Sequence, residues 1–281
     1  MRELPPTVVE RQTRAARSGV RTSLLSVPSA AGIEAVGLEP VGEVMGCAVR
    51  TALQRHPRPY SKSAWEEMPR RTGQYFDDFS LPYLVGLRTG YHSALARMRR
   101  EANALRADGI VGVRLTRTPL GSGNEFVAMG TAVRARSRVR PKSLFTTELA
   151  GSDVAKLMLA GWAPMQLQWA AAAHAVYTAN DRQIRVMRRS LRAGNFELDL
   201  YTKLISDVRA DARKEFHRMT KAVDADGGIV SDMAVSSWEP GETLVAAIAV
   251  VCGTAIAQFR RTDAAPARTL AVMPLWRQGE Y

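Results

Sequence analysis

The chain has 281 residues, of which 46% are hydrophobic and 23% are charged, and this composition excludes a chain that is disordered throughout. Its 39 lysine and arginine residues outnumber its 27 aspartate and glutamate residues, and the resulting net charge of +12 attracts acidic partners such as nucleic acid, anionic lipid or another protein's acidic face. The charge does not select among these partners, and solvated basic surface explains it equally well.

The two cysteines, Cys47 and Cys252, lie far apart in the sequence and form no CxxC pair. This pattern argues against a zinc module or a disulfide framework and fits a reducing cytoplasm. Residues 1–19 have no apolar segment after their first charges, so we expect no secretory signal. The longest apolar run, residues 244–257, is too short to span a membrane. We therefore expect a cytoplasmic protein without a membrane span.

In chain order, residues 1–36 lack a sustained hydrophobic period and are interpreted as an N-terminal arm. Residues 40–53 are apolar and predict an opening strand, and residues 56–78, rich in proline, arginine and aromatic residues, are interpreted as an inserted loop. Apolar residues then recur at steps of three and four, which predicts an amphipathic helix with a basic outer face. The apolar stripe consists of Leu84, Leu87, Tyr91, Ala94, Leu95, Met98, Ala102 and Leu105.

The end of this helix and the residues that follow it predict a β-hairpin. Gly109 stands where the helix should stop, which predicts a left-handed C-cap at this glycine. Residues 110–115 and 125–133 are rich in β-forming residues and are joined by a turn of glycine, proline and asparagine. A basic segment follows, and an extended backbone would place its four arginines on one side. Its basic residues are Arg134, Arg136, Arg138, Arg140 and Lys142.

The segment 104–133 returns in a weaker form at 222–256. Asp108 and Asp226 are 118 residues apart and each precedes a glycine, while Gly130-Thr131-Ala132 and Gly253-Thr254-Ala255 are 123 residues apart. The second copy again predicts a strand (164–177), a helix and a hairpin (229–235 and 243–259). Its helical stripe consists of Tyr201, Leu204, Ile205, Val208, Ala212, Phe216, Met219 and Val223.

These patterns predict an α+β fold built as a tandem repeat of a strand, helix, strand, strand unit. Each unit would form an antiparallel sheet that one long helix covers on one face. The predicted boundaries are 37–142 for the first repeat, with its inserted loop and basic linker, 161–260 for the second, divergent repeat, and 261–281 for a C-terminal tail. The uncovered sheet faces then need cover from the other unit or from another chain.

The first copy resembles the YbjQ-like family, whose label is a heavy-metal-binding domain. The resemblance lies in residues 42–46 (GEVMG), residues 104–113 (ALRADGIVGV) and residues 130–133 (GTAV). The second copy keeps Ala225-Asp226-Gly227 but has residues 166–170 (QLQWA) in place of the opening motif. The resemblance implies a dodecin-like β-α-β-β subunit that assembles into rings, typically pentamers, and it suggests a heavy-metal ion as a ligand.

The candidate metal ligands do not cluster in the sequence. Soft metals take thiolate and imidazole ligands that converge in threes or fours, yet the two cysteines and four histidines show no ligand spacing. A site would form only if assembly brought Cys47 and Cys252 together. The alternative is that both are small buried residues packed in strands.

Three carboxylates are candidate residues for a ligand site or a ring interior. Asp108 and Asp226 recur in both copies, but a carboxylate beside a helix end also accepts backbone amide hydrogen bonds and fixes a turn. Glu43 lies in an otherwise apolar strand, where a carboxylate is costly unless it is paired or exposed. It either lines the interior of a ring or faces solvent.

Catalytic motifs are missing from the sequence, which has no GxSxG, HExxH or P-loop, and we expect a non-enzymatic, ring-forming homo-oligomer that binds a metal or small ligand. The alternative is an electrostatic binder of nucleic acid or of an acidic partner. The contacts would come from the basic linker (Arg134, Arg136, Arg138, Arg140 and Lys142) and from Arg185, Arg188 and Arg189.

Overall fold

The computed structural model describes residues 5–18, 22–51, 75, 77–121, 123–138, 140–178, 181, 184, 197–241 and 244–260. Arg185, Arg188 and Arg189 lie outside these residues, as do residues 56–74 and 76 of the predicted insertion and the tail from residue 261. The elements are α1 (Pro6–Ser18), α2 (Val27–Ala35), β1 (Leu38–Thr51), α4 (Asp77–Ala104), β2 (Gly109–Leu120), β3 (Gly123–Ala135), β4 (Phe145–Thr146), α5 (Gly151–Leu159), β5 (Trp162–Tyr177), α7 (Asp199–Ala222), β6 (Gly227–Gly241) and β7 (Leu244–Gln258).

Two sheets carry the fold, and each has the predicted order of elements in sequence. The first sheet has the strand order β1-β3-β2-β4, and the second has the order β5-β7-β6. All pairings are antiparallel except that between β2 and β4. We call β1, α4, β2 and β3 the first unit, and β5, α7, β6 and β7 the second unit. The α+β prediction is confirmed, including the hairpins that end both units.

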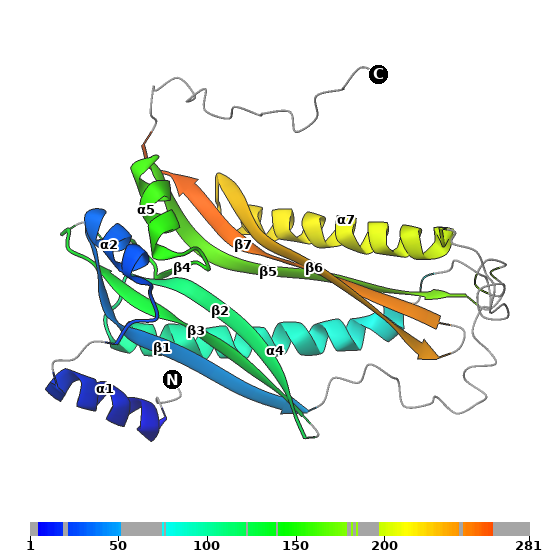
Figure 1. Ribbon diagram of the computed structural model, residues 1–281, viewed down its shortest axis with the longest axis horizontal. Helices are drawn as coiled ribbons and strands as arrows, with labels where there is room; N and C mark the ends of the chain where they lie inside the picture. The colour runs from blue at the N-terminus through cyan, green and yellow to red at the C-terminus, as the bar shows by residue number, and fades with distance from the viewer. Residues whose placement is uncertain are drawn as a thin grey trace, which may run out of the picture.

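The layers run α7, second sheet, α4, first sheet (Figure 1). Helix α7 covers one face of the second sheet through the predicted stripe that includes Leu204, Val208 and Phe216. Helix α4 packs on the first sheet, and the same core cluster continues into Leu167 and Ala171 of β5. One helix therefore separates the two sheets and contacts both.

Small residues allow α4 to approach the first sheet closely. A Cβ atom at Gly46 of β1 would overlap the carbonyl oxygen of Ala94 and the amide nitrogen of Met98, so the helix backbone lies directly on the strand. In the second unit, a Cβ atom at Gly253 of β7 would lie 2.9 Å from the ring of Phe216 in α7. Glycine is needed at these positions because another residue's atoms occupy the site of its side chain.

The N-terminal residues 22–35 are more ordered than the predicted arm. Helix α2 packs against α5, and Ile33 joins Val133 and Val154 in a third buried cluster over one end of the first sheet. The sequence does not reveal either helix because each has only nine residues. Such a short helix repeats its apolar spacing too few times to form a recognisable period.

The predicted left-handed cap at Gly109 is wrong. The residue with positive φ after α4 is Arg106, at 56°, and Asp224 at 57° takes the same place after α7. Gly109 instead begins β2, where a Cβ atom would overlap the ring of Phe145. The glycine is therefore explained by packing against β4 rather than by helix termination.

Both units share further backbone irregularities. Gly37 and Gly161, 124 residues apart, precede the opening strands with φ values of 79° and 85°. Register shifts follow in β1 between Pro40 and Gly42 and in β5 between Pro164 and Gln166. Equal irregularities at equal sequence offsets are the expected result when two units have the same fold.

The segment between the units joins the two sheets. The backbone N–H of Leu167 donates to the Thr146 hydroxyl at 3.1 Å, and the hydroxyls of Thr147 and Thr254 lie 2.7 Å apart. The Glu148 carboxylate accepts hydrogen bonds from Ser231 and Thr254. Among the described helices, none is long and apolar enough to cross a membrane.

Candidate functional site

The candidate site is the face of the first sheet that points away from α4, which we call the outer face. Side chains alternate along a strand, so Val44, Gly46 and Ala48 face the helix while the residues between them face outward. The outer face consists of Glu43, Met45, Cys47 and Val49 of β1, Glu125, Val127 and Met129 of β3, and Arg114, Thr116 and Thr118 of β2.

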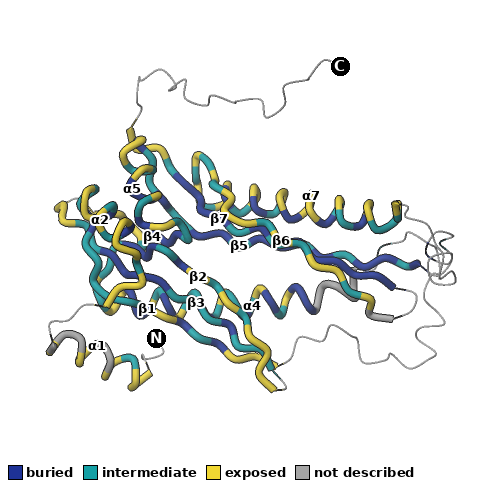
Figure 2. The backbone as a smooth tube through the Cα atoms, viewed as in Figure 1, coloured by how far each residue is buried: buried dark blue, intermediate teal, exposed yellow. Residues whose placement is uncertain are grey.

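The middle of the outer face is apolar and open to solvent among the described residues. Met45 is 42% exposed and Val49 is 58% exposed, and the mixed exposure along β1 is visible in Figure 2. Met45 lies opposite Met129, which in turn lies opposite Arg114. One end of the face is covered, because the backbone N–H of Leu24 donates to the Thr131 hydroxyl at 3.0 Å. The apolar rows beyond Thr131 remain without such cover.

The corresponding face of the second sheet is buried instead. At the same offset of 124 residues, Trp169 takes the place of Met45 and Ala171 that of Cys47. Trp169 packs against the ring of Tyr91 in α4, with centroids 4.9 Å apart, and Ala171 lies in the core cluster of α4. The two units thus differ in the cover of equivalent faces, and the described residues leave the face in the first unit open.

Cys47 lies on the outer face and donates a hydrogen bond to Glu125 Oε1 at 3.1 Å. Partial burial, this hydrogen bond and the Glu125 charge raise the pKa of the Cys47 thiol. Burial together with the charges of Glu148 and Asp232 raises the pKa of Cys252 to about 12. Both shifts disfavour the thiolate form, which is the form that binds a metal.

The described residues of one chain do not fit a heavy-metal site. Cys252 packs against the α4 core cluster, while Cys47 faces away from α4 on the other sheet, so the helix separates the two sulfurs. No group of three histidine, cysteine, aspartate or glutamate side chains gathers within the described part of the chain. A soft-metal site would need ligands from more than one chain.

The two repeated aspartates lie at equivalent positions and hold equivalent backbone groups. Asp108 Oδ2 accepts a hydrogen bond from the Ala135 N–H at 2.8 Å, and Asp226 Oδ2 accepts one from the Gln258 N–H, also at 2.8 Å. Each aspartate thus ties the turn after its helix to the end of the last strand. Glu43 lies on the outer face, opposite Thr131.

The basic linker is not one extended strand, because β3 ends at Ala135 and the chain bends over 136–138. Arg134 donates to the carbonyl oxygens of Leu105 (2.6 Å) and Arg106 (3.1 Å), which places a positive charge at the C-terminal end of α4. Arg140 forms an ion pair with Asp108 at 2.9 Å. Two of the five predicted contact residues thus hold the fold, while Arg136, Arg138 and Lys142 are exposed.

A family comparison matches part of the first unit. Residues 81–136 match the YbjQ family model. The family is described as "Putative heavy-metal-binding", and the matched segment runs from α4 to the end of β3. The resemblance is confirmed for this segment. The opening motif at 42–46 and the second copy lie outside the match and stay predictions.

One curated relative is the Encapsulin nanocompartment protein Rv1762c of Mycobacterium tuberculosis (strain ATCC 25618 / H37Rv). It is 34% identical to this chain over 175 residues, which cover 58% of this chain and 58% of the relative. The chain therefore matches somewhat more than half the length of that protein.

The apolar residues of the outer face, Met45, Val49, Val127 and Met129, were missed as site residues from sequence. Their alternation with buried residues was readable once β1 and β3 were recognised. The sequence does not indicate which face of the first sheet is left uncovered, because this depends on how the second unit packs against α4.

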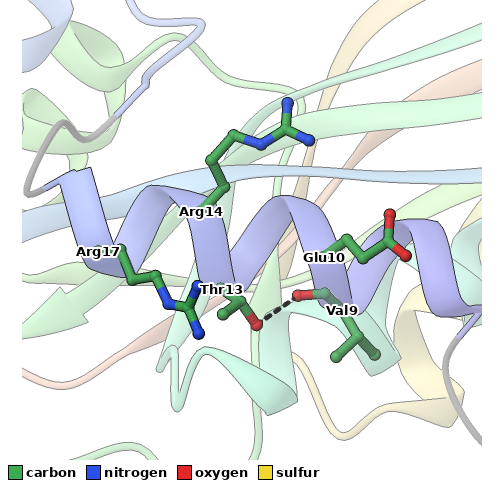
Figure 3. Close-up of a pocket in the computed structure, with 5 residues that line it drawn as sticks. All are labelled: Val9, Glu10, Thr13, Arg14 and Arg17. Carbon is green, nitrogen blue, oxygen red and sulfur yellow. Dashed lines mark hydrogen bonds between the residues drawn. The ribbon is translucent and has the colours of Figure 1, made fainter.

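A shallow pocket lies along helix α1 and is shown in Figure 3. The Thr13 hydroxyl donates to the Val9 carbonyl oxygen at 2.8 Å, and the side chains of Arg14 and Arg17 extend from the helix. The described residues that line this pocket all come from the one helix. It therefore lacks the converging groups from several elements that a binding site requires.

Proposed function

We propose that this protein is a non-enzymatic assembly protein that associates with copies of itself through the outer face and acts within an encapsulin-type nanocompartment. The observation that carries the proposal is the open apolar outer face, whose counterpart in the second unit is buried against α4. A sheet face of this kind requires a partner, since large exposed apolar patches mark interaction sites.

The chemistry of the outer face favours a second copy as that partner. Its apolar residues are Met45, Val49, Val127 and Met129. Glu43 lies on β1, Glu125 on β3, and Arg114 on β2 opposite Met129. Two copies packed face to face can pair the acidic strands of one with Arg114 of the other. Because Met45 and Val49 are 42% and 58% exposed, burial of the rest of each side chain would contribute about 1 kcal/mol.

The nanocompartment part of the proposal rests on the relative named above, whose matched region covers 58% of this chain. A protein shell repeats the same binding surface many times. An oligomer can bind several of these repeats at once, so that many weak contacts add up to a higher overall affinity.

Light scattering coupled to size-exclusion chromatography tests the assembly. The substitution Val49→Lys places a charge at the most exposed apolar side chain of the outer face and is expected to lower the measured mass towards that of one 30.8 kDa chain. Val230→Lys is the matched control, because Val230 is a strand valine that is 52% exposed on β6, outside this face. A monomeric wild-type protein, or equal masses for wild type and Val49→Lys, would refute assembly through this face.

Co-expression with an encapsulin shell protein tests the second part. Wild-type protein should co-purify with the shells on a density gradient, and Val49→Lys should do so less. Wild-type protein that assembles but never sediments with shells would remove the nanocompartment role and leave the assembly in place.

We propose metal binding only for the assembled oligomer, because Cys47 and Cys252 do not lie together within one chain. Elemental analysis of the purified oligomer, compared with the Cys47→Ser/Cys252→Ser double variant, decides it. Equal metal content in the two proteins would show that the thiols hold no metal.

Nucleic-acid binding is the alternative function, supported by the exposed Arg136, Arg138 and Lys142. Retention on a DNA or RNA column that falls steeply between low and moderate salt would favour it, because released counterions make such binding salt-dependent.

A further inference from the structure

A groove of about 610 Å³ lies between α4 and α7, across the edge strand β5. Leu84 and residues 171–173 give it an apolar floor. Its charged rim comprises four cationic side chains and two carboxylates, namely Arg88, Lys214, Arg218, Lys221, Asp211 and Glu215. This volume is within the range of small-molecule sites, and groups from three elements converge on it.

The carboxylates of the groove are already paired. Glu215 accepts two hydrogen bonds from Arg218, at 2.7 and 2.8 Å, and lies 3.5 Å from Arg88. The hydrogen bonds from Arg218 lower the pKa of Glu215, so this carboxylate stays ionised and holds the guanidinium at the rim. Asp211 Oδ2 lies 2.8 Å from His174 Nε2.

Positive charge is left over after these pairings. Arg88 also donates to the Ala171 carbonyl oxygen at 2.8 Å, which fixes it beside the floor. Lys214 and Lys221 form no ion pair with any residue in the described ranges, and both are exposed. Among the described lysine, arginine, aspartate and glutamate residues that line the groove, four cations against two carboxylates leave two uncompensated positive charges.

The cations are specific to the second unit. At the offset of 118 residues, the positions of Lys214 and Lys221 in α7 correspond to Ala96 and Asn103 in α4, while Arg218 corresponds to Arg100. Lys214, Arg218 and Lys221 follow one another at steps of four and three and therefore lie on one side of α7. The repeated fold does not require charges at these places.

We propose that this groove binds a small organic phosphate. The phosphate dianion would lie among Lys214, Arg218 and Lys221, and the apolar part of the ligand over residues 171–173. A dianion matches two uncompensated charges better than a monocarboxylate does, and Arg and Lys are the usual phosphate-binding residues. The apolar floor adds affinity that an inorganic phosphate ion cannot gain.

Isothermal titration calorimetry at constant ionic strength tests the proposal with three probes: phenyl phosphate, inorganic phosphate and benzoate. Phenyl phosphate should bind most tightly, because it alone carries both the dianion and the apolar ring. Equal binding of benzoate would overturn the charge argument, equal binding of inorganic phosphate would overturn the role of the floor, and no binding of phenyl phosphate would overturn the site.

Matched variants locate the binding on α7. The double variant Lys214→Gln/Lys221→Gln should weaken phenyl phosphate binding about tenfold. Arg209→Gln/Arg213→Gln removes the same two charges from exposed positions of the same helix outside the groove, and should change the affinity less than about twofold. Equal losses in the two double variants would show that only the net charge of the protein matters. Neither pair lies on the outer face, so this result is independent of the assembly.

Discussion

Gln168 places an amide in the core of the second unit without a complete set of hydrogen bonds. Its side chain is 1% exposed, and Nε2 has no hydrogen-bond partner among the described residues. The equivalent residue of the first unit, 124 positions earlier, is the buried Val44. A buried polar group that lacks a partner costs about 1–3 kcal/mol.

The substitution Gln168→Met should therefore stabilise the protein. Methionine has a similar length and no polar hydrogen to satisfy, so the free energy of unfolding should rise by about 1 kcal/mol. Thermal unfolding monitored by circular dichroism measures the change. Gln258→Met, at an exposed position of β7, is the control and should remain within about 0.5 kcal/mol of wild type. A loss of stability in Gln168→Met would mean that the amide is bonded in solution.

The sequence showed that the opening motif is replaced around Gln168, but it did not show the consequence. A glutamine next to Leu167 and Trp169 is compatible with either face of a strand. Its burial follows from the register of β5 against β7, where Gln168 lies opposite Gly253, and from the helix that covers this pair. Both depend on contacts between residues far apart in sequence.

At the scale of elements, Asp108 and Asp226 are clamps between a turn and a strand end. Asp108→Ala should lower the free energy of unfolding by about 1.5–3 kcal/mol, because its carboxylate is 11% exposed and serves both the Ala135 amide and Arg140. Asp226→Ala should cost only about 0.5–1.5 kcal/mol, because Asp226 is exposed and holds the Gln258 amide alone.

Urea denaturation of each variant measures these costs, and light scattering on the same samples shows whether assembly changes. A structural clamp predicts lower stability with an unchanged mass of the folded oligomer. If Asp108→Ala kept its stability but lost assembly, the interior-lining role considered for these carboxylates would replace the clamp.

The long elements were predictable because their patterns repeat often enough to be read. The stripe from Leu84 to Ala102 covers several helical turns, and its members are buried except for Tyr91 and Leu95, which are partly buried against the same core. The hairpins were predictable from their glycine-rich turns. Helices α2 and α5 were not, because nine residues contain too few repeats, and Gly109 was misread because its close neighbour, Phe145, lies 36 positions later in the chain.

At the scale of the whole molecule, α4 of the first unit packs against both sheets. It fills the space between the two sheets, and the ring of Tyr91 touches Phe126 of the first sheet (5.1 Å between centroids) and Trp169 of the second (4.9 Å). Tyr83 similarly contacts Trp238 of β6, at 5.3 Å. The first unit therefore depends on the second sheet to bury the far side of its own helix.

This shared helix predicts that the two units unfold together. Urea unfolding should give one transition at the same midpoint by far-ultraviolet circular dichroism and by hydrogen exchange of the β3 and β7 amides.

Trp169→Ala should lower the free energy of unfolding by about 2–4 kcal/mol, since it removes a large side chain from the interface between the units. The protection of the β3 amides from hydrogen exchange should fall as much as that of the β7 amides. Trp162→Ala, on the same strand but outside the three core clusters, should cost less at the same protein concentration. Two separate transitions, or β3 amides that keep their protection in Trp169→Ala, would show that each unit is stable without the other. If α4 needs both sheets, loss of the second sheet exposes the apolar side of α4 and must destabilise the first unit as well.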